Sequence, residues 1–468
     1  MFVLALFLAT ADPQESSPSS VALDDRLSAV ARDGIQLQHA PGGAVAIVRD
    51  GTIVYEKAFG QRNIAAGEPV DTDTQFEIGS VTKQFTAAAI LQLKEQGKLR
   101  LDDPLAKYVP LFPHAREITL RQLLNQVTGL PNYTDVNHFI SIAKEPGSFE
   151  KIEGLIAGEP LHFRPGTKWE YSNTNYVALG RVIEVISHQS YAAYIGTHIF
   201  QPLGMTHSAM IADEPALTNF ATPYWRGNKN SEVLSPAQPL YDAWAGAAGA
   251  IVSTVGDLAR WDVALQSGKV VSAEDFSLMT TPAKLANGSP TGYGFGWQID
   301  SVDGQKRIWH NGGTFGSSSS NVTFPQQNVD IIVLENEDGA ATSALATKLY
   351  ESMFPQIVAT ASRPAAGEDA AVTARARMLI DAAVKGALPA DQLSPLVRQK
   401  FPPEQQQQIG QQLATMGNVK DVIFKRKLES GDDTTYIYRV DFANATMSFS
   451  LSINKRTNLV DGIWFGPA

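Results

Sequence analysis

The residues of this chain that most clearly suggest chemistry are Ser80 and Lys83, in the segment EIGSVTKQFTAAAI, residues 77–90. This segment predicts the start of a long, Ala-rich amphipathic helix, on which positions i and i+3 share one face and a hydroxyl can hydrogen-bond to an amine. The helix N-terminus carries a partial positive charge, which disfavours an ammonium and lowers the lysine pKa. A neutral amine there could take the serine proton, and free backbone N–H groups could stabilise an oxyanion.

Ser-x-x-Lys is a weak signal by itself, because this chain contains it four times. The other three pairs are Ser141/Lys144, Ser148/Lys151 and Ser452/Lys455. The first runs into Pro146-Gly147, the second opens a short helix weakened by glycines, and the third lies in a predicted strand, where residues three apart point to opposite faces. For Ser80 and Lys83, the alternative interpretation is a helix cap beside a solvated surface charge.

Tyr171-Ser172-Asn173 is the only Tyr-x-Asn among the 13 tyrosines. A phenol near an amine can be pushed toward phenolate and can relay a proton. The amide of Asn173 can donate to a substrate carbonyl and accept from a lysine. Taken alone, the pattern also fits a packed tyrosine followed by a turn asparagine.

His310-Asn311-Gly312 is the only His-x-Gly among the eight histidines, and it ends a predicted strand. Glycines at this point let the backbone approach a ligand closely, and a neighbouring N–H can complete an oxyanion hole. The alternative interpretation is a hairpin turn after a half-buried histidine.

The elements that must position these residues form an α/β lobe interrupted by helices. Apolar runs predict strands at residues 44–48, 52–59, 295–300, 306–310, 319–324 and 329–334. Asp50-Gly51 predicts a tight hairpin, because both residues tolerate positive φ. Helices are predicted at 22–33, ended by Gly34, and at 80–97, 176–187, 254–265 and 340–354. We expect the early and late strands to share one antiparallel sheet, with a helical insertion lobe at about 98–265 and a cleft between the two parts.

The last hundred residues predict a separate α+β domain. Residues 361–371 have the composition of a linker, and a helix at 372–387 precedes three or four strands. In the segments TYIYRVDF and TMSFSLSIN, apolar residues alternate at period two, so one face of each strand should be buried. The domain loosely resembles small cystatin-like folds and contains no catalytic constellation, so its role stays open.

Composition excludes several classes of function. The chain has 468 residues, a formal charge of −10 and no cysteine. It therefore lacks the basic surplus that nucleic acid requires, and it cannot form disulfides, a thiolate nucleophile or a Cys-ligated metal site. No H-E-x-x-H motif or other close His pair indicates a metal hydrolase, and GYGFG at 292–296 lacks the spacing of a nucleotide loop. We expect no metal and no cofactor.

The N-terminus predicts export. Residues 2–11, FVLALFLATA, are too short to span a bilayer but fit the apolar region of a signal peptide ending in Ala9-Thr10-Ala11. No Lys or Arg precedes Arg26, so the usual positive flank is missing. We expect a signal peptide at residues 1–11, no integral membrane span, and a periplasmic or secreted protein.

Taken together and in this order, the three motifs resemble those of the serine β-lactamase and penicillin-binding protein superfamily. The branch most similar to this chain holds class C β-lactamases, DD-carboxypeptidases, D-aminopeptidases and related esterases, and the resemblance covers about residues 22–355. Segments that support it are LLNQVTGLPNY at 123–133, FRPGTKWEYSNTNYVALG at 163–180 and AGAAGAIVSTVGDLARW at 245–261. It implies an α/β (α+β) hydrolase domain at 22–360, an antiparallel sheet flanked by helices, followed by the small α+β domain at 366–468.

The resemblance also implies a role for each motif residue. Ser80 would be the acylated nucleophile, Lys83 its general base and Tyr171 a partner in proton transfer. Asn173 would orient the substrate, and the backbone N–H groups of Ser80 and Gly313 would form the oxyanion hole, next to Gly312. His310 stands where many relatives have the lysine of a Lys-Thr-Gly motif. Because a mostly neutral imidazole holds a carboxylate less firmly than an ammonium, we expect poor β-lactam hydrolysis.

The leading hypothesis is a serine hydrolase that acts through an acyl-enzyme on an ester, a D-amino-acid peptide or a β-lactam, with a small-molecule or peptide as partner. A second hypothesis is a penicillin-binding receptor that acylates slowly and barely turns over. A third keeps hydrolysis but makes His310 the base for Ser80, which would leave Lys83 without a role. The sequence does not indicate an oligomeric state.

Overall fold

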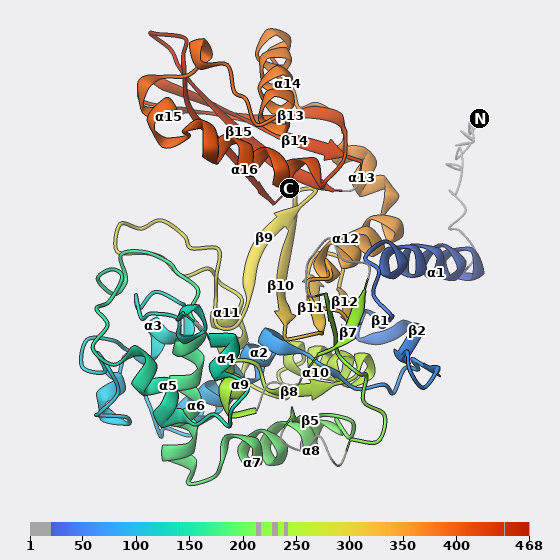
Figure 1. Cartoon of the computed structure of the whole chain (residues 1–468), viewed down its shortest axis with the longest axis vertical. Helices are drawn as coiled ribbons and strands as arrows, with labels where there is room; N and C mark the ends of the chain where they lie inside the picture. Colours follow the sequence, from blue (N-terminus) through green and yellow to red (C-terminus); the bar gives the residue numbers. More distant parts are fainter. Residues whose placement is uncertain are drawn as a thin grey trace, which may run out of the picture.

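The computed structural model describes residues 20–137, 139–211, 217–226, 233–237, 242–443 and 445–467. The predicted signal peptide, residues 1–11, lies outside them. Within these ranges, no helix is both long and apolar enough to cross a bilayer. We call residues 20–361 the main domain and residues 370–467 the C-terminal domain; Figure 1 shows them as two bodies joined near α13 (Pro355–Ala361).

A seven-stranded antiparallel sheet forms the centre of the main domain, in the order β3-β2-β1-β12-β11-β10-β9. Its strands are β1 (Gly42–Arg49), β2 (Thr52–Asn63), β3 (Glu68–Pro69), β9 (Gln298–Val302), β10 (Gln305–Gly313), β11 (Ser318–Phe324) and β12 (Val329–Glu335). β1 pairs with β12, so strands from the two ends of this domain lie side by side. The prediction that early and late strands share one sheet is confirmed.

Helices cover both faces of this sheet (Figure 1). On one face pack α1 (Ser20–Leu37) and α12 (Thr342–Met353), and on the other α2 (Thr82–Glu95) and α10 (Val255–Gln266). The side chains of Val45 and Ile47 join the first core, and those of Ala44 and Ala46 join the second. This burial of both faces explains why β1 is a continuous apolar run rather than an alternating one.

Two local predictions have opposite outcomes. Asp50 and Gly51 adopt φ values of 51° and 75°, as expected of the hairpin turn. The prediction that Gly34 ends the first helix is wrong, because α1 continues to Leu37. A Cβ at Gly34 would lie 2.4 Å from Leu345 Cδ1, so this glycine instead allows α12 to pack closely against α1.

The insertion lobe is helical, as predicted. It contains α3 (Leu120–Leu124), α4 (Phe139–Ile142), α5 (Phe149–Ile156), α6 (Asn173–Ser187), α7 (Tyr191–Ile195), α8 (Gln201–Leu203), α9 (Asp242–Gly249) and α11 (Ala273–Met279). Single turns are η1 (Gly79–Val81), η2 (Leu105–Lys107), η3 (Tyr133–Asp135) and η4 (Gly196–Phe200). Short strands are β4 (Phe76–Glu77), β5 (Ala209–Met210), β6 (Tyr224–Arg226), β7 (Leu234–Pro236) and β8 (Ile251–Ser253).

The C-terminal domain is α+β, as predicted, with its own hydrophobic core. Its sheet has the order β13-β14-β15-β16, and its helical elements are α14, η6, α15 and α16. Their bounds are β13 (Val419–Ser430), β14 (Asp433–Phe442), β15 (Thr446–Asn454), β16 (Val460–Pro467), α14 (Ala370–Val384), η6 (Ala390–Gln392), α15 (Pro395–Lys400) and α16 (Pro403–Ala414). Tyr438, Val440, Phe449 and Leu451 are buried, which confirms the alternation along β14 and β15.

Arg439 of β14 joins the two domains. Its guanidinium contacts the carboxylate of Asp303, in the turn between β9 and β10, and lies 3.9 Å from Glu351 of α12. The Asp303 side chain is fully buried and that of Arg439 is 7% exposed. Burial, with the negative charge of Asp441, raises the pKa of Glu351 to about 7. Because a buried carboxylate without a cation is strongly unfavourable, the contact fixes the tip of the β9–β10 hairpin to the C-terminal domain.

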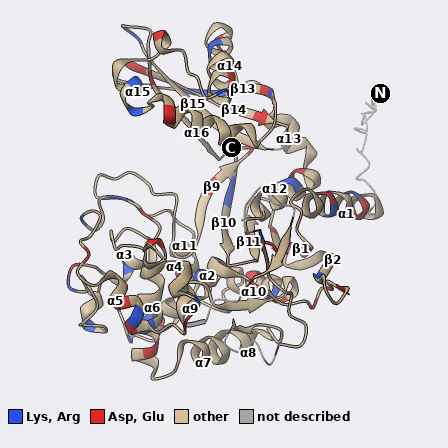
Figure 2. Ribbon diagram, in the orientation of Figure 1, with Lys and Arg blue, Asp and Glu red and all other residues tan. Residues whose placement is uncertain are grey.

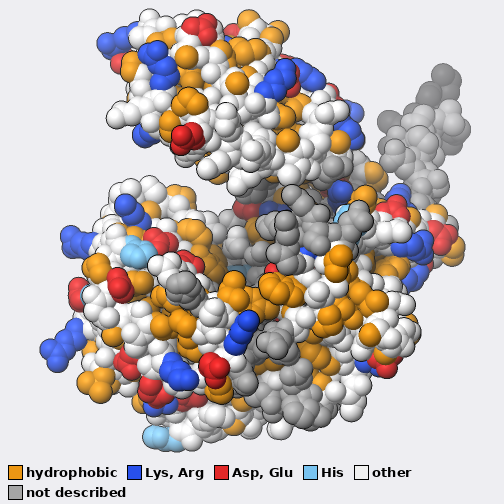
Figure 3. All heavy atoms as spheres, in the orientation of Figure 1, with side chains coloured by type: hydrophobic (Ala, Val, Ile, Leu, Met, Phe, Trp, Pro, Cys, Tyr) orange, Lys and Arg blue, Asp and Glu red, His pale blue; other side chains and the backbone are white. Residues whose placement is uncertain are grey.

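Charged residues are interspersed over both domains (Figure 2). On the face drawn in Figure 3, a hollow separates the C-terminal domain from the helical lobe of the main domain.

Two carboxyl groups in the main domain are buried close together. Asp330 Oδ1 accepts from Gln266 Nε2 at 2.6 Å and from Thr323 Oγ1 at 2.7 Å. Burial raises the pKa of Asp330 to about 6. Burial, with the nearby charge of Asp330, also raises the pKa of Asp262 well above its usual value. The folded protein therefore holds these protons more tightly than the unfolded chain does, so stability falls as pH rises from about 4 through about 6.

We expect Asp330→Asn to raise the free energy of unfolding by about 1–3 kcal/mol at about pH 8, with little gain below about pH 4. The amide keeps an acceptor oxygen for Gln266 and Thr323 but carries no charge. Urea unfolding across this pH range measures the effect. Asp33→Asn, at an exposed position of α1, is the control and should leave the profile unchanged. An equal gain at low and high pH would contradict the assignment to a buried carboxylate.

Candidate active site

Ser80 and Lys83 meet where η1 passes into α2. Lys83 Nζ lies 3.0 Å from Ser80 Oγ. Neither η1 nor α2 has a side-chain cap, Lys83 is 0% exposed and Ser80 is half-buried. The interpretation of a helix cap beside a solvated surface charge is therefore wrong.

The surroundings of Lys83 favour a neutral amine. Nζ lies 2.8 Å from Asn173 Oδ1 and 2.7 Å from the carbonyl oxygen of Ala248. None of the ion pairs formed by the described residues includes Lys83, and burial lowers its pKa well below the usual value. A neutral amine has two hydrogens and one lone pair. With both hydrogens donated to these two oxygens, the lone pair is left for the hydroxyl proton of Ser80.

The carbonyl that holds Lys83 comes from a kink in α9. Gly246 adopts φ 44° and ψ −138° inside this helix. The kink turns the carbonyl of Ala247 toward Thr86 Oγ1, at 2.7 Å, and that of Ala248 toward Lys83. A glycine is suited to this position because residues with a Cβ rarely adopt positive φ.

Tyr171 contributes a second contact to the nucleophile. Its hydroxyl lies 2.8 Å from Ser80 Oγ, and Lys83 Nζ lies 4.9 Å from the centre of its ring. Burial raises the pKa of Tyr171 far above the usual value. Burial therefore favours the neutral phenol, which can donate a proton, over the phenolate.

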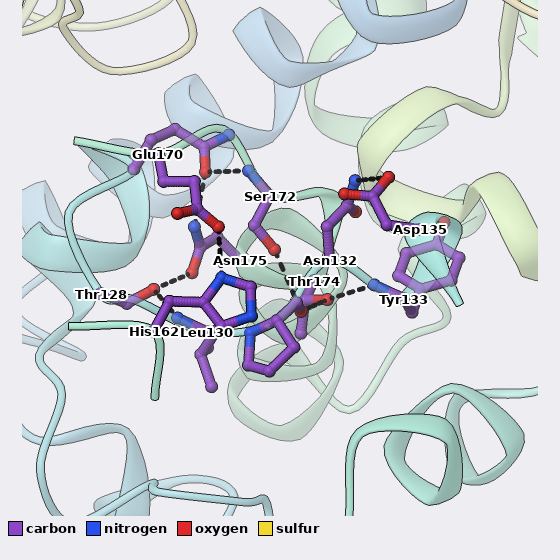
Figure 4. Close-up of polar contacts among 12 residues, drawn as sticks. Thr128, Leu130, Asn132, Tyr133, Asp135, His162, Glu170, Ser172, Thr174 and Asn175 are labelled. Atoms are coloured by element: carbon purple, nitrogen blue, oxygen red, sulfur yellow. Dashed lines mark hydrogen bonds and ion pairs between the residues drawn. The ribbon is translucent and has the colours of Figure 1, made fainter. Parts of the chain in front are cut away.

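A loop of the helical lobe holds Tyr171 and Asn173 in place. The backbone N–H of Asn173 donates to Asn132 Oδ1 at 3.0 Å, and that of Ser172 donates to Gln126 Oε1 at 3.0 Å. The Tyr133 N–H donates back to Thr174 Oγ1 at 3.1 Å (Figure 4). The sequence analysis did not single out Asn132 or Gln126, although both lie in the resembling segment 123–133.

His310 lies beside Tyr171, with 6.0 Å between ring centres, and is 1% exposed. Its Nδ1 lies 2.6 Å from the carbonyl oxygen of Asn311, and its Nε2 lies 3.0 Å from the hydroxyl of Tyr293. A carbonyl only accepts, so Nδ1 carries the hydrogen and Nε2 accepts from Tyr293. Burial lowers the pKa of His310 well below its usual value. With both nitrogens occupied, His310 is not the base for Ser80.

Tyr293 is a site residue that the sequence analysis missed. It lies just before the strand predicted at 295–300, and β9 begins only at Gln298. Gly292 and Gly296 adopt φ values of 73° and 77°, so the segment turns and directs Tyr293 inward. There its ring meets that of Tyr171 edge to face, with 6.3 Å between centres.

The glycines after His310 allow the end of β10 to lie against η1. A Cβ at Gly312 would lie 1.9 Å from the carbonyl oxygen of Ile78, and one at Gly79 would lie 2.7 Å from the nitrogen of Gly313. Only glycines permit this approach of two backbones. It brings the backbone of Gly313 next to the turn that carries Ser80, which is where the predicted oxyanion hole requires it.

The structure thus brings together every predicted site residue: Ser80, Lys83, Tyr171, Asn173, His310, Gly312 and Gly313. Within the described ranges, no group of three or more His, Asp or Glu side chains is placed to hold a metal ion.

Residues 27–351 match the family model described as Beta-lactamase. The chain belongs to the beta-lactamase family. This membership confirms the resemblance drawn from the motifs and confirms the fold class.

Similar proteins agree with this family. Protein flp of Staphylococcus aureus (strain MRSA252) is 28% identical over 341 residues, or 71% of this chain and 66% of its own length. The octameric penicillin-binding protein homologue from Pyrococcus abyssi is 25% identical, with a TM-score of 0.62 over 92% of this chain and 96% of that one. A D-stereospecific amidohydrolase from Streptomyces sp. is 28% identical, with a TM-score of 0.60 over 72% of this chain and 99% of that one.

Proposed function

We propose that this protein is a serine hydrolase that cleaves esters and amides through an acyl-enzyme on Ser80 Oγ. The observation that carries the proposal is the buried amine of Lys83, 3.0 Å from that oxygen and held by two uncharged acceptors. Burial favours the neutral form of this amine, which can act as a base, whereas an exposed lysine is protonated at neutral pH.

In the proposed reaction, the lone pair of Lys83 takes the proton of Ser80 as Oγ attacks the substrate carbonyl. The N–H groups of Ser80 and Gly313 stabilise the oxyanion that forms. Tyr171, a neutral phenol 2.8 Å from Oγ, donates a proton to the leaving group as the carbonyl–leaving-group bond breaks. The proton that Lys83 took from Ser80 passes to the oxygen of Tyr171, so Lys83 is again a neutral base. A water molecule then attacks the carbonyl of the acyl-enzyme and gives one proton to Lys83, which returns it to Ser80 Oγ as the bond between Oγ and the acyl group breaks.

The environment of His310 favours substrates without a carboxylate. Its ring is neutral, buried and engaged at both nitrogens, so it offers no positive charge to a carboxylate. The β-lactam antibiotics carry such a carboxylate, whereas simple esters and amides need not. The printed name of the Streptomyces relative, a D-stereospecific amidohydrolase, further supports an amide of a D-amino acid as one substrate class.

We expect steady turnover of p-nitrophenyl acetate and of D-alanine amide, and slow or no turnover of a chromogenic cephalosporin. A spectrophotometric panel of these compounds, with L-alanine amide as the stereochemical control, measures the three rates. A burst of one product equivalent followed by a stall, with every compound, would instead indicate the slowly acylating receptor. Cephalosporin as the best substrate would contradict the inference from His310.

A further inference from the structure

The C-terminal domain contains a cavity of about 290 Å³ between α16 and the strands β15 and β16. Ten of its twelve lining residues are apolar or aromatic, the other two are glutamines, and none is charged. Ala383, at the end of α14, and Leu413 of α16 form buried parts of its wall. The side chains of this domain's core therefore leave a substantial space unfilled, although the domain is small.

The half-buried glutamine of this wall is already hydrogen-bonded. Gln406 Oε1 already accepts from the N–H of Leu388 at 2.8 Å, and its Nε2 donates to the carbonyl oxygen of Phe401 at 2.7 Å. The other glutamine, Gln412, is exposed. An apolar cavity of about 150 Å³ can hold a single benzene ring. The space here is larger, opens to solvent beside Gln412, and suits an apolar molecule larger than benzene.

Aromatic and sulfur-containing side chains narrow the class of ligand. Phe401, Trp464 and Phe465 contribute rings to the wall, and Met416 and Met447 contribute thioethers, which contact aromatic rings favourably. Trp464 is 57% exposed, so its indole stands at the opening of the cavity rather than in the core. Because no charged side chain lines the site, a carboxylate, ammonium or phosphate group bound there would have no partner of opposite charge.

We propose that this cavity is a binding site for a small, uncharged aromatic compound. Its volume is too small for a folded segment of a protein. The site belongs to the C-terminal domain and does not include the residues proposed to act on substrate.

The test is titration of the full chain with N-phenyl-1-naphthylamine, an uncharged probe that joins a phenyl ring to a naphthalene and whose fluorescence rises in apolar surroundings. We expect saturable binding of one equivalent in the micromolar range. Ala383→Leu adds three carbons to the buried wall and should weaken binding at least tenfold without lowering Tm. Ala382→Leu is the matched control: the adjacent α14 residue lines a different, more open surface with Arg377 and Asp381, so binding should not change.

A second measurement does not depend on a core substitution. Trp464 is the only tryptophan after residue 309, so energy transfer to a bound probe should come largely from this side chain. Trp464→Phe should remove most of that transferred emission. The proposal would be overturned by non-saturable binding of the probe or by equal affinity in Ala383→Leu and Ala382→Leu. Unchanged energy transfer to the probe in Trp464→Phe would also overturn it. Displacement by 1-octanol but not by naphthalene would overturn the aromatic class.

Discussion

Replacing Ser80 by alanine is expected to reduce kcat for p-nitrophenyl acetate by about 10⁴-fold or more, because the oxygen that forms the acyl-enzyme is removed. The oxyanion donors and the binding surface remain, so a small residual rate above the uncatalysed reaction is expected. Covalent labelling by a serine-directed fluorophosphonate should disappear from the intact-protein mass spectrum. Loss of turnover and loss of labelling both report on Ser80 Oγ.

Ser141→Ala supplies the matched control, since Ser141 belongs to another Ser-x-x-Lys pair of this chain and is exposed. It should retain full activity and full labelling. Labelling of Ser80→Ala at another residue, or turnover near that of the parent protein, would assign the nucleophile to another residue and refute the proposed function.

Substituting methionine for Lys83 is expected to lower kcat/KM by about 10²–10⁴-fold, the usual contribution of a positioned base. Methionine has a similar length and no charge, so it fits the buried space, but it cannot accept the proton of Ser80. It leaves Asn173 Oδ1 and the carbonyl of Ala248 without their donor. Steady-state kinetics on the ester measure the loss.

The pH profile adds a readout that a packing defect would not produce. Only the neutral amine of Lys83 is a base, and burial lowers its pKa well below the usual value. The rate of the parent protein should therefore fall as the pH drops through this lowered pKa, and Lys83→Met should lose that acid limb. Lys151→Met, at an exposed lysine of a Ser-x-x-Lys pair, is the control. Retention of more than half the activity in Lys83→Met would assign the base to another group.

Local chemistry made much of the fold predictable. Alternation or continuity of apolar residues located the strands, and Asp50-Gly51 located the hairpin between β1 and β2. The predictions failed where contacts between distant segments, rather than the local sequence, determine the structure. Gly34 was predicted to end a helix, but the glycine is needed because a side chain there would collide with Leu345. The helices α15 and α16 were not predicted, and α13 occupies the first residue of the expected linker, because short helices with few apolar residues give weak periodicity.

The candidate site likewise contains residues that the local sequence could identify and residues that it could not. Ser80, Lys83, Tyr171 and His310 could be selected because their side chains carry chemistry at recognisable spacings. The carbonyl of Ala248 could not, since any residue has a carbonyl and only the kink at Gly246 directs this one. Asn132 and Tyr293 likewise act through contacts between segments far apart in the chain, which no local pattern encodes.

The contact between Arg439 and Asp303 limits how this architecture can be taken apart or diversified. The acidic hairpin tip belongs to one domain and its neutralising cation belongs to the other. A chain shortened at residue 361 would lose the guanidinium and expose Asp303 to water, so the tip of the hairpin that carries His310 would lose its anchor. A different module in place of the tail could restore that anchor by delivering a cation to the same point.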